Sequence, residues 1–308
     1  MDTAVSPPPA VADLRVLIIS PVRNEGAHIE RVAEAMQAQS RTPDLWLVCD
    51  DASEDDTATI LAKLAPEIPF MQVVSNANQP ATTRDRLALA LEAQAFNRAL
   101  RHVDWHNFDL IGKLDGDIEL PAQYFERLLA DFNENERLGI TGGSIVEQAA
   151  PGAEWKAVRV PDYHVHGALK LYSRKCFEAV GGIQERLGWD TIDETYARMF
   201  GFDTVHRRDL VARHLRPSAS ADGLMRGRAR HGECAYIVRY SLPWVILRAL
   251  RMAWLSEPRL FGGIFFLGGY LSAVAKRAPK VEDDEFRRFV RRELRGRMLA
   301  FVRTKRLG

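Results

Sequence analysis

The stretch that decides the fold is FDLIGKLDGD, residues 108–117, in which an apolar run ends at two aspartates separated by one glycine. Phe108–Leu114 is short and apolar, as a buried strand is. Asp115 and Asp117 stand at i and i+2, so on extended chain their carboxylates point the same way. Such a pair suits Mg²⁺ or Mn²⁺, with substrate phosphates completing the ligand shell. An acidic Asp-Gly turn is the alternative explanation.

Working outward from this stretch, strand and helix patterns alternate along the chain. Three further short apolar runs predict strands, at Leu14–Ser20, Leu45–Cys49 and Phe70–Val74. Helical spacing predicts helices over residues 27–39, 57–64 and 86–102. A strand about every 30 residues is typical of βαβ units and a largely parallel sheet. Ligands collect at the carboxyl ends of the strands in such sheets, where the acidic motifs of this chain stand.

Composition limits the class of protein. The chain has 308 residues, 46% hydrophobic and 27% charged, which indicates one large globular domain or a domain with an appendage. Three widely spaced cysteines exclude a disulfide framework and a CxxC zinc site, and favour a reducing, cytoplasmic location. We expect no signal peptide, because no basic region followed by an apolar run opens the sequence.

The net charge of +1 hides an asymmetry. Residues 276–308 carry 12 basic and 5 acidic side chains, a net +7, so the rest of the chain sums to −6. A basic tail on a slightly acidic body indicates that only the tail meets an anionic surface. We expect no nucleic-acid binding, because the body has no basic stripe interleaved with aromatic residues.

A second acidic motif, DDASEDDT at residues 50–57, follows the predicted strand that ends at Cys49. Helix capping explains Asp55 and Asp56, which precede the helix predicted from Thr57. It does not explain the two acids directly at the strand end. Asp51 there could accept hydrogen bonds from the imide N–H of a uracil-like base or from a ribose.

A third acidic group comprises Asp190, Asp193 and Glu194, which share one helical face at i, i+3 and i+4. Like charges so close raise the pKa of at least one member, which suits a group that accepts a proton. The alternative is a helix cap, with Asp190 as N-cap and Asp193 three residues later. Trp189 beside them packs against a sugar ring or belongs to the core.

These segments, in this order, resemble the family 2 glycosyltransferases of GT-A fold. The resemblance rests on SPVRNE at 20–25, DDxSxDxT at 50–57, KLDGD at 113–117, GGI at 181–183, GWDTIDE at 188–194 and HLRP at 214–217. It covers about two thirds of the chain, residues 14–220. It implies an α/β fold of Rossmann-like GT-A type, a mostly parallel sheet flanked by helices, with a C-terminal helical extension. The expected organisation is a disordered segment 1–13, a catalytic domain 14–225 and a helical region 226–308.

The resemblance also implies roles for single residues. Asp115 would lie by the ribose or the metal, Asp117 would ligate the metal at the diphosphate, and Asp190 would be the catalytic base. Gly201, eleven residues after Asp190, sets this register. Because Trp189 stands where the family has Glu, the base is Asp190 with Asp193 and Glu194 as alternatives. The expected nucleotide-sugar-binding residues are Pro21, Arg23, Glu25, Asp51, Arg84 and Asp115.

Two further residues are assigned from their neighbourhood. Arg84, in a polar loop before a long helix, could meet the diphosphate, with a solvated loop as the alternative. His214 could reach the metal or the leaving phosphate, with a surface histidine as the alternative.

The function implied is a metal-dependent, inverting glycosyltransferase using Mg²⁺ or Mn²⁺. It would move a sugar from a nucleotide-diphosphate sugar, expected to be a UDP-sugar, to a glycan, lipid-linked or other hydroxyl acceptor in cell-surface polysaccharide biosynthesis. One alternative is a non-catalytic nucleotide-sugar-binding module. Another is a sugar-phosphate nucleotidyltransferase, which would need a Gly- and Arg/Lys-rich loop after the first strand, where this chain has only Arg23.

The C-terminal region differs from the body. Ser241–Leu255 is apolar but carries two arginines, and Leu260–Ala275 is uncharged but shorter than the roughly 20 residues of a spanning helix. Glu285–Val302 is a basic amphipathic helix by its spacing. We expect residues 241–306 to contact the cytoplasmic face of a membrane as a peripheral attachment. The alternatives are helices that cover the catalytic domain, or a dimer interface.

Overall fold

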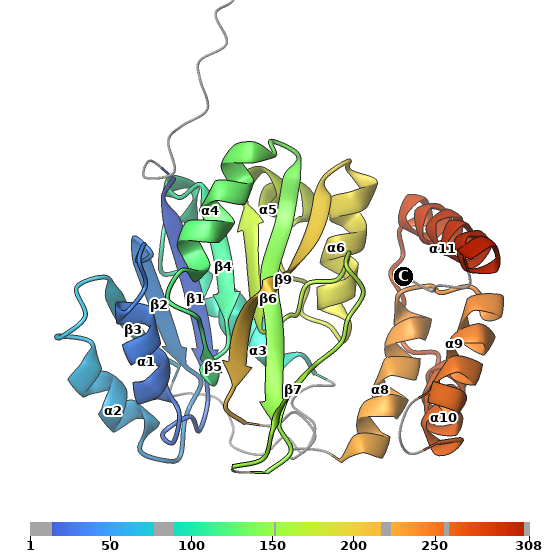
Figure 1. The fold of residues 1–308 in the computed structure, drawn as a ribbon, viewed down its shortest axis with the longest axis horizontal. Helices are drawn as coiled ribbons and strands as arrows, with labels where there is room; N and C mark the ends of the chain where they lie inside the picture. The colour runs from blue at the N-terminus through green and yellow to red at the C-terminus, as the bar shows by residue number, and fades with distance from the viewer. Residues whose placement is uncertain (1–13, 77–88, 151, 217–222, 256–258, 305–308) are drawn as a thin grey trace, which may run out of the picture.

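The computed structural model describes residues 14–76, 89–150, 152–216, 223–255 and 259–304 (Figure 1). The expected disorder of residues 1–13 and the loop with Arg84 therefore lie outside the described residues. The strands are β1 (Val16–Val22), β2 (Leu45–Asp50), β3 (Met71–Ser75), β4 (Leu110–Leu114), β5 (Ile118–Glu119), β6 (Leu138–Gln148), β7 (Trp155–Ala157), β8 (Leu169–Ser173) and β9 (Asp203–His214). The helices are α1 (Ile29–Gln37), α2 (Thr57–Leu64), α3 (Leu91–Leu100), α4 (Tyr124–Glu134), α5 (Arg174–Val180), α6 (Trp189–Met199), α8 (Leu224–Ile237), α9 (Leu242–Leu255), α10 (Phe261–Ala275) and α11 (Asp284–Thr304).

Strands β3, β2, β1 and β4 lie side by side in that order and run parallel. Each is a short run of apolar residues, and β1, β2 and β4 are buried over almost their whole length. A strand covered on both faces needs such an uninterrupted run. The four strands predicted in this part of the sequence are confirmed to within two residues at each end.

The sheet continues from β4 through β8, β6 and β9 to β5, so within the described residues nine strands, β7 included, form one sheet. Here β8 is antiparallel to β4 and β6, whereas β6 and β9 run parallel. The register of β6 against β9 shifts after Gly143, where the pairing passes from Arg207 to Val211. The expected mostly parallel sheet flanked by helices is confirmed, with antiparallel strands in its second half.

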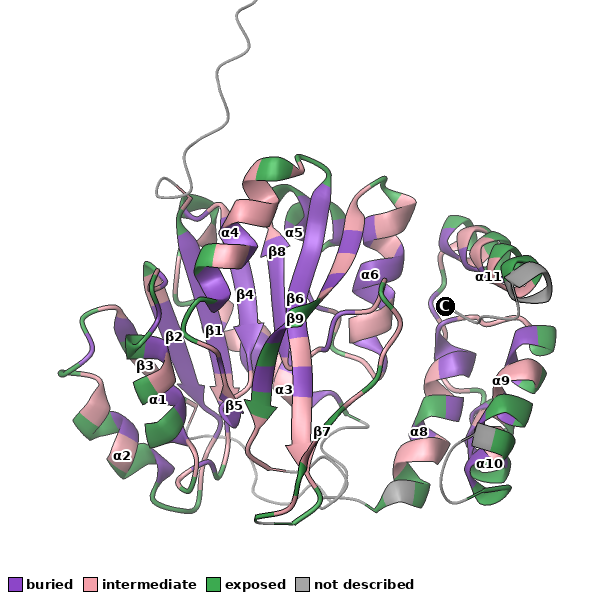
Figure 2. Ribbon diagram, viewed as in Figure 1, coloured by how far each residue is buried: buried purple, intermediate pink, exposed green. Residues whose placement is uncertain are grey.

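Helices cover both faces of the sheet, and the strands are its most buried layer (Figure 2). On one face α1, α2 and α4 contribute Val32, Leu61 and Leu128 to a core cluster. On the other face α3 and α5 contribute Phe96 and Phe177 to a second cluster. Each helix therefore buries one apolar stripe against the sheet, as the spacing of its apolar residues predicts.

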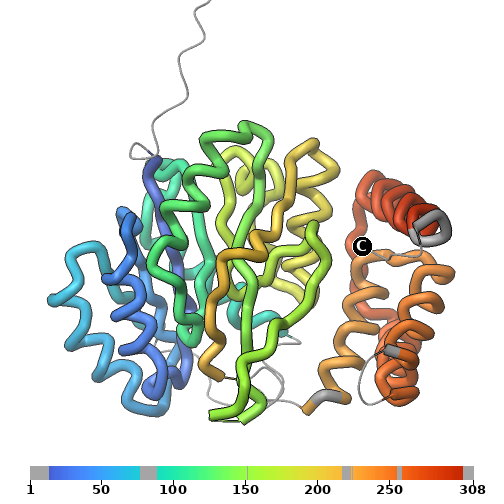
Figure 3. Tube along the Cα trace, in the orientation of Figure 1, coloured from blue at the N-terminus to red at the C-terminus, as the bar shows by residue number. Residues whose placement is uncertain are grey.

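The C-terminal helices α8 to α11 stand to one side of the sheet (Figures 1 and 3). Helices α8 and α10 cross at two glycines, since a Cβ on Gly232 would overlap the carbonyl oxygen of Phe266 and one on Gly269 that of Ala229. Arg198 of α6 joins this region to the body through Glu293 of α11, with an Nε to Oε1 distance of 2.7 Å. The expected C-terminal helical extension is present. No helix in the described part of the chain has the length and hydropathy that crossing a bilayer requires.

Candidate active site

The carboxyl ends of β1, β2 and β4 lie at one end of the sheet, because the three strands are parallel neighbours (Figure 1). Pro21 stands at the end of β1, paired in register with Cys49 of β2. Asp51 follows β2, and its backbone N–H donates to the carbonyl oxygen of Val22 at 2.9 Å. Asp115 follows β4. The fold thus brings the predicted strand-end residues to one edge.

Asp51 is buried and accepts two hydrogen bonds through Oδ1. Arg98 of α3 donates at 2.6 Å and Asn76 at 3.2 Å. Arg23 donates to the backbone oxygen of Asp51 at 3.0 Å. The neighbouring Asp50 instead accepts from the hydroxyl of Ser53 at 2.6 Å, so it shapes the loop. Of the two strand-end acids, Asp51 is the one that meets cations and amides from other elements.

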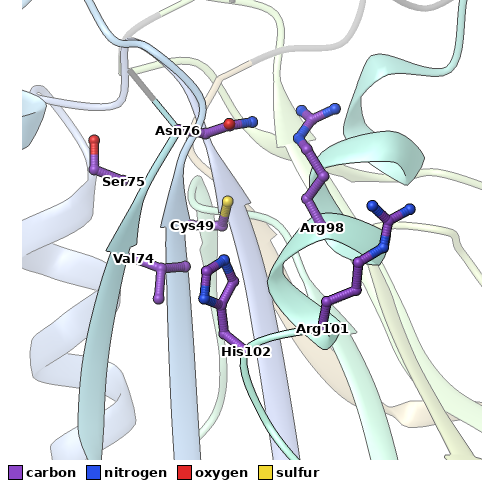
Figure 4. A pocket seen from close by; sticks show the side chains of 7 residues that line it. All are labelled: Cys49, Val74, Ser75, Asn76, Arg98, Arg101 and His102. Carbon is purple, nitrogen blue, oxygen red and sulfur yellow. The ribbon is translucent and has the colours of Figure 1, made fainter. Parts of the chain in front are cut away.

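A cavity of about 240 Å³ adjoins this carboxylate (Figure 4). Arg98, Arg101 and His102, from α3 and the turn after it, lie across from the side chains of β2 and β3. Sequence reasoning missed Arg98. Its only signal was its place on the helix after the third strand, which does not show that it reaches Asp51. The full lining is Cys49, Val74, Ser75, Asn76, Arg98, Arg101 and His102.

The loop after β2 is held mainly by Asp55. Its carboxylate accepts from the backbone N–H groups of Thr57 and Gly26, both at 3.0 Å. Asp56 occupies the N-cap position of α2 but makes no capping hydrogen bond with its side chain. Capping therefore explains Asp55 but not Asp56, which corrects the prediction for that residue.

Glu25, Asp117 and Arg216 form one ionic group. The Nε of Arg216 lies 3.2 Å from Oδ2 of Asp117, and its guanidinium also pairs with Oε1 of Glu25. The second oxygen of Glu25, Oε2, is buried and has no hydrogen-bond partner among the described residues. Arg216 was not predicted, because its role depends on a contact across 191 residues of sequence.

His214 lies against Asp117 because β5 pairs with β9, which sets Ile118 opposite His214 in register. Its Nε2 is 3.3 Å from Oδ2 of Asp117, and its Nδ1 is 2.7 Å from Oε1 of Glu147. Burial alone would lower the pKa of His214, but hydrogen bonds to these two carboxylates raise it to about 10. The side chain is therefore an imidazolium at neutral pH when only these groups surround it.

The donor set at Asp117 suits a divalent cation that substrate phosphates complete. If a cation displaced the proton on Nε2 of His214, this nitrogen and the carboxylate oxygen 3.3 Å away could be neighbouring ligands of one ion. Asp115, two residues before Asp117, pairs with Lys113. In the described residues no three His, Cys, Asp or Glu side chains form a metal-binding group. One or two protein carboxylates commonly suffice for Mg²⁺ when the substrate supplies the rest.

Two buried lysines lie beneath the site. Lys113 of β4 pairs with Asp115 and donates to the carbonyl oxygen of Gly167 at 3.2 Å. Its Nζ and that of Lys170 lie 5.3 and 5.4 Å from the ring centre of Trp189. Burial lowers the pKa of Lys113, but Asp115 and Glu92 outweigh it, so the pKa is raised and the charge is kept. Trp189 is itself buried in the core.

Asp190 follows Trp189 in the sequence and lies close to Gly167. A Cβ placed on Gly167 would be 3.3 Å from the Cβ of Asp190, and the carbonyl of Gly167 holds Lys113. The side chain of Asp190 is 35% exposed, and Nε2 of His164 lies 3.9 Å from its Oδ2. Helix α6 begins after Gly188 at its N-cap, so Asp190 is not the cap.

Asp193 and Glu194, one turn further on, are fully buried. Asp193 accepts from Lys170 at 3.0 and 3.1 Å and from the hydroxyl of Tyr172. Glu194 accepts from His164 at 2.9 Å and from the backbone N–H of Val165 at 2.7 Å. Burial raises the pKa of Asp193 to about 7, whereas His164 and Lys170 outweigh burial at Glu194 and lower its pKa to about 2. Both carboxylates therefore already accept hydrogen bonds from neighbouring groups inside the protein.

The fold and this edge define an α/β protein of Rossmann-like class, with charged side chains gathered where the parallel strands end. The sequence pattern of the family described as glycosyl transferase family 2 matches residues 17–184. The chain belongs to glycosyltransferase family 2, and the resemblance seen in the sequence is confirmed. No curated protein sequence matches the chain.

Solved structures share the fold at low sequence identity. The mannosyltransferase PcManGT from Pyrobaculum calidifontis, in complex with GDP-Man and Mn²⁺, is 18% identical with a TM-score of 0.55, covering 94% of this chain and 86% of that one. TarS 1–349 from S. aureus, in complex with UDP-GlcNAc, is 14% identical with a TM-score of 0.56, covering 95% and 88%. GalNAc-T7 with UDP, GalNAc and Mn²⁺ is 14% identical with a TM-score of 0.55, covering 93% and 57%.

Proposed function

We propose that this family 2 glycosyltransferase transfers a sugar with inversion from a nucleotide-diphosphate sugar to an acceptor hydroxyl. One observation carries the proposal. The carboxylate of Asp190 is partly exposed, and Asp190 neighbours Gly167. The carbonyl oxygen of Gly167 accepts from Lys113, which pairs with the strand-end acid Asp115. A proton acceptor and a group of donor-binding residues thus adjoin at one edge of the sheet.

The donor nucleotide would bind at the ends of β1 and β2. A carboxylate flanked by a guanidinium and an amide, as at Asp51, can accept an N–H of a base or a ribose hydroxyl while its neighbours donate. Pro21, Arg23 and Glu25 border this region, and Asp115 would face the ribose. The neighbours bound to UDP-GlcNAc and to GDP-Man support a nucleotide-sugar donor, for which a UDP-sugar remains the first expectation.

Asp117 and His214 would hold a divalent cation, Mg²⁺ or Mn²⁺, together with the donor's phosphates. When bound, such a cation offsets the charge that builds on the departing diphosphate. Two neighbours contain Mn²⁺, which supports this assignment. Arg216 pairs with Asp117 and Glu25 and so adds a positive charge beside the proposed cation. This charge would also stabilise the departing diphosphate.

Asp190 would act as the base. It takes the proton of the acceptor hydroxyl while that oxygen bonds to the anomeric carbon from the face opposite the diphosphate. The bond from the anomeric carbon to the phosphate oxygen breaks, and the diphosphate leaves with the electron pair. Asp193 and Glu194 are not suited to this step, because each is buried and already accepts hydrogen bonds. Lys170, which donates to the backbone oxygen of Asp190 at 2.6 Å, would fix its position.

The acceptor proposed is a glycan, a lipid-linked saccharide or another hydroxyl compound of cell-surface polysaccharide synthesis, met on the cytoplasmic side. The three cysteines are free, and two of them are buried, which fits a reducing compartment. The acidic set at the strand ends favours an enzyme over a binding module of the same fold.

A thermal-shift screen with UDP-, GDP-, dTDP- and CMP-sugars, with and without Mn²⁺, tests the donor. One nucleotide class should raise the unfolding midpoint by about 5 °C at saturation, because ligand binding stabilises the folded state. Asp117→Ala should remove the Mn²⁺-dependent part of that shift and abolish transfer. Asp56→Ala, at an exposed acid without a capping bond, is the matched control.

Release of nucleoside diphosphate in the presence of candidate acceptors separates the alternatives. Transfer with release of the nucleoside diphosphate is the expected result. Donor binding without turnover for any acceptor would identify a binding module. In a parallel assay supplied with a nucleoside triphosphate and a sugar 1-phosphate, release of pyrophosphate would identify a nucleotidyltransferase.

A further inference from the structure

The C-terminal helices expose an unusual amount of apolar surface. Of the fifteen large apolar side chains that are exposed in the described part of the chain, ten lie between residues 242 and 274. We name these ten the α9–α10 apolar face. They are Leu242, Ile246, Leu250, Trp254, Leu260, Phe261, Ile264, Phe265, Leu271 and Val274. Exposed apolar side chains gathered in this way mark an interaction surface, whereas scattered ones do not.

Helix α9 presents a single stripe to the outside. Leu242, Ile246, Leu250 and Trp254 follow one another at intervals of four residues, and their exposed fractions range from 47% to 79%. At this spacing they lie along one side of the helix. Its inner side is also apolar, with Val245 and Ala249 buried against the neighbouring helices. The helix therefore has apolar residues on both sides, and only one side is covered.

Helix α10 departs from the usual pattern. A helix of a water-soluble domain turns large apolar residues inward and polar ones outward. Helix α10 buries one large residue, Phe266, among small ones such as Gly263, Gly269 and Ala273. It exposes four large apolar residues, Phe261, Ile264, Phe265 and Leu271, and it has no charged residue. Small residues at the helix crossing and large apolar ones facing out are the arrangement found where lipid is the surroundings.

Charge indicates which partner covers this face. Residues 241–308 carry 15 basic and 6 acidic side chains, a net +9, on a chain whose total is +1. Arg251 and Arg259 are exposed near the end of α9 and the start of α10, and Lys276 and Arg277 are exposed at the end of α10. A second copy would bring two such positive regions together, which like-charge repulsion opposes. An anionic bilayer attracts them, at about 1 kcal/mol for each basic residue near its surface.

The helices suit a position at the bilayer surface. Helices α9 and α10 have 14 and 15 residues, so each is about 22 Å long, against a hydrocarbon core of about 30 Å. Trp254, 79% exposed, is of the residue type that favours the boundary between lipid and water.

We propose that the α9–α10 apolar face inserts into the interfacial layer of an anionic phospholipid bilayer, with Arg251, Arg259, Lys276 and Arg277 on its headgroups. The face lies outside the donor site, so this proposal does not depend on the proposed function.

Vesicle sedimentation of the full chain tests the proposal. The wild-type protein should sediment with vesicles of phosphatidylcholine containing about one third phosphatidylglycerol, and much less with phosphatidylcholine alone or at high salt. Ile264→Glu/Leu271→Glu should lower the partition coefficient about tenfold or more, because two apolar contacts are lost and two negative charges are added. Arg251→Gln should lower it about fivefold.

The matched control is Phe200→Glu/Val211→Glu, which makes the same kind of change at two exposed apolar positions of the body. It should sediment as the wild type does, and circular dichroism should show both double variants folded. Sedimentation equal in the two double variants would overturn the proposal. So would failure of the wild type to sediment at low salt, and a dimer that Ile264→Glu/Leu271→Glu dissociates would then assign the face to a second copy.

Discussion

Two groups of three carboxylates differ in what surrounds them. Asp51, Asp115 and Asp117 stand at strand ends and pair with Arg98, Lys113 and Arg216, in that order. The other group, on α6, is split between one partly exposed member and two fully buried ones. The pairing of the strands brings the first group together. In the second group, one carboxylate lies at the surface and two lie in the core.

The difference teaches that position relative to the core decides what a carboxylate can do. Asp190, Asp193 and Glu194 share one helical face by sequence, yet of the three only Asp190 has a partly exposed side chain. The other two neutralise Lys170, which is buried beneath α6. A buried ammonium needs such partners because an unpaired charge in the interior is costly.

The sharpest test of this division is Asp190→Asn. We expect transfer to fall by about 10²- to 10⁴-fold, because the amide cannot take the acceptor's proton. Donor binding should be unchanged, since Asp190 adjoins the donor site without belonging to it. Turnover assays and donor thermal shifts measure the two effects separately. Asp162→Asn, the same change at an exposed acid of the preceding loop, should keep full turnover. Full turnover in Asp190→Asn as well would place the base elsewhere.

Glu194→Gln should act mainly on folding: we expect a large fall in the free energy of unfolding. Removing one partner of a buried ion pair costs about 3–5 kcal/mol, and chemical denaturation would measure it. Because the pKa of Glu194 is lowered from 4.5 to about 2, its contribution is complete above pH 4.5 and is lost as the pH falls toward 2. The variant should therefore lose less stability than the wild type over that range.

The control for this test is Glu178→Gln, at an exposed position of the adjacent helix α5. It should be as stable as the wild type at every pH. If Glu194→Gln were equally harmless to stability but abolished transfer, the division of roles on α6 would be reversed.

The smallest effect is expected at the donor site. Asp51→Asn should weaken donor binding about tenfold, because an amide oxygen accepts less strongly than a carboxylate. Titration calorimetry would measure it. Asp56→Asn makes the same chemical change at an exposed position of the same loop and should bind donor as the wild type does. Equal affinity in the two variants would remove Asp51 from the donor site.

The first half of the fold and the acidic motifs could be predicted from the sequence because their signals are local. An apolar run such as Leu45–Cys49, followed by acidic residues, predicts a buried strand with carboxylates at its carboxyl end. The segment between Asp117 and Gly188 gave no such signal. Strand β6 contains Gly142 and Gly143, and its register against β9 is shifted, so neither strand has a simple alternation.

The cations of the site could not be predicted for the same reason. Arg98, Lys170 and Arg216 reach their carboxylates across 47, 23 and 99 residues of sequence. Nothing in the spacing of either partner records the pairing, which exists only once the sheet has formed. His214 was predicted from its neighbourhood in the sequence, and the pairing of β5 with β9 explains why it lies at Asp117.

The contact between Gly188 and Cys234 has a mechanical consequence. Gly188 adopts a φ of +83°, and a Cβ there would overlap the sulfur of Cys234, so α8 rests directly on the residue before α6. A side chain at position 188 would therefore push α8 away from the start of α6, the helix that carries Asp190 two residues later.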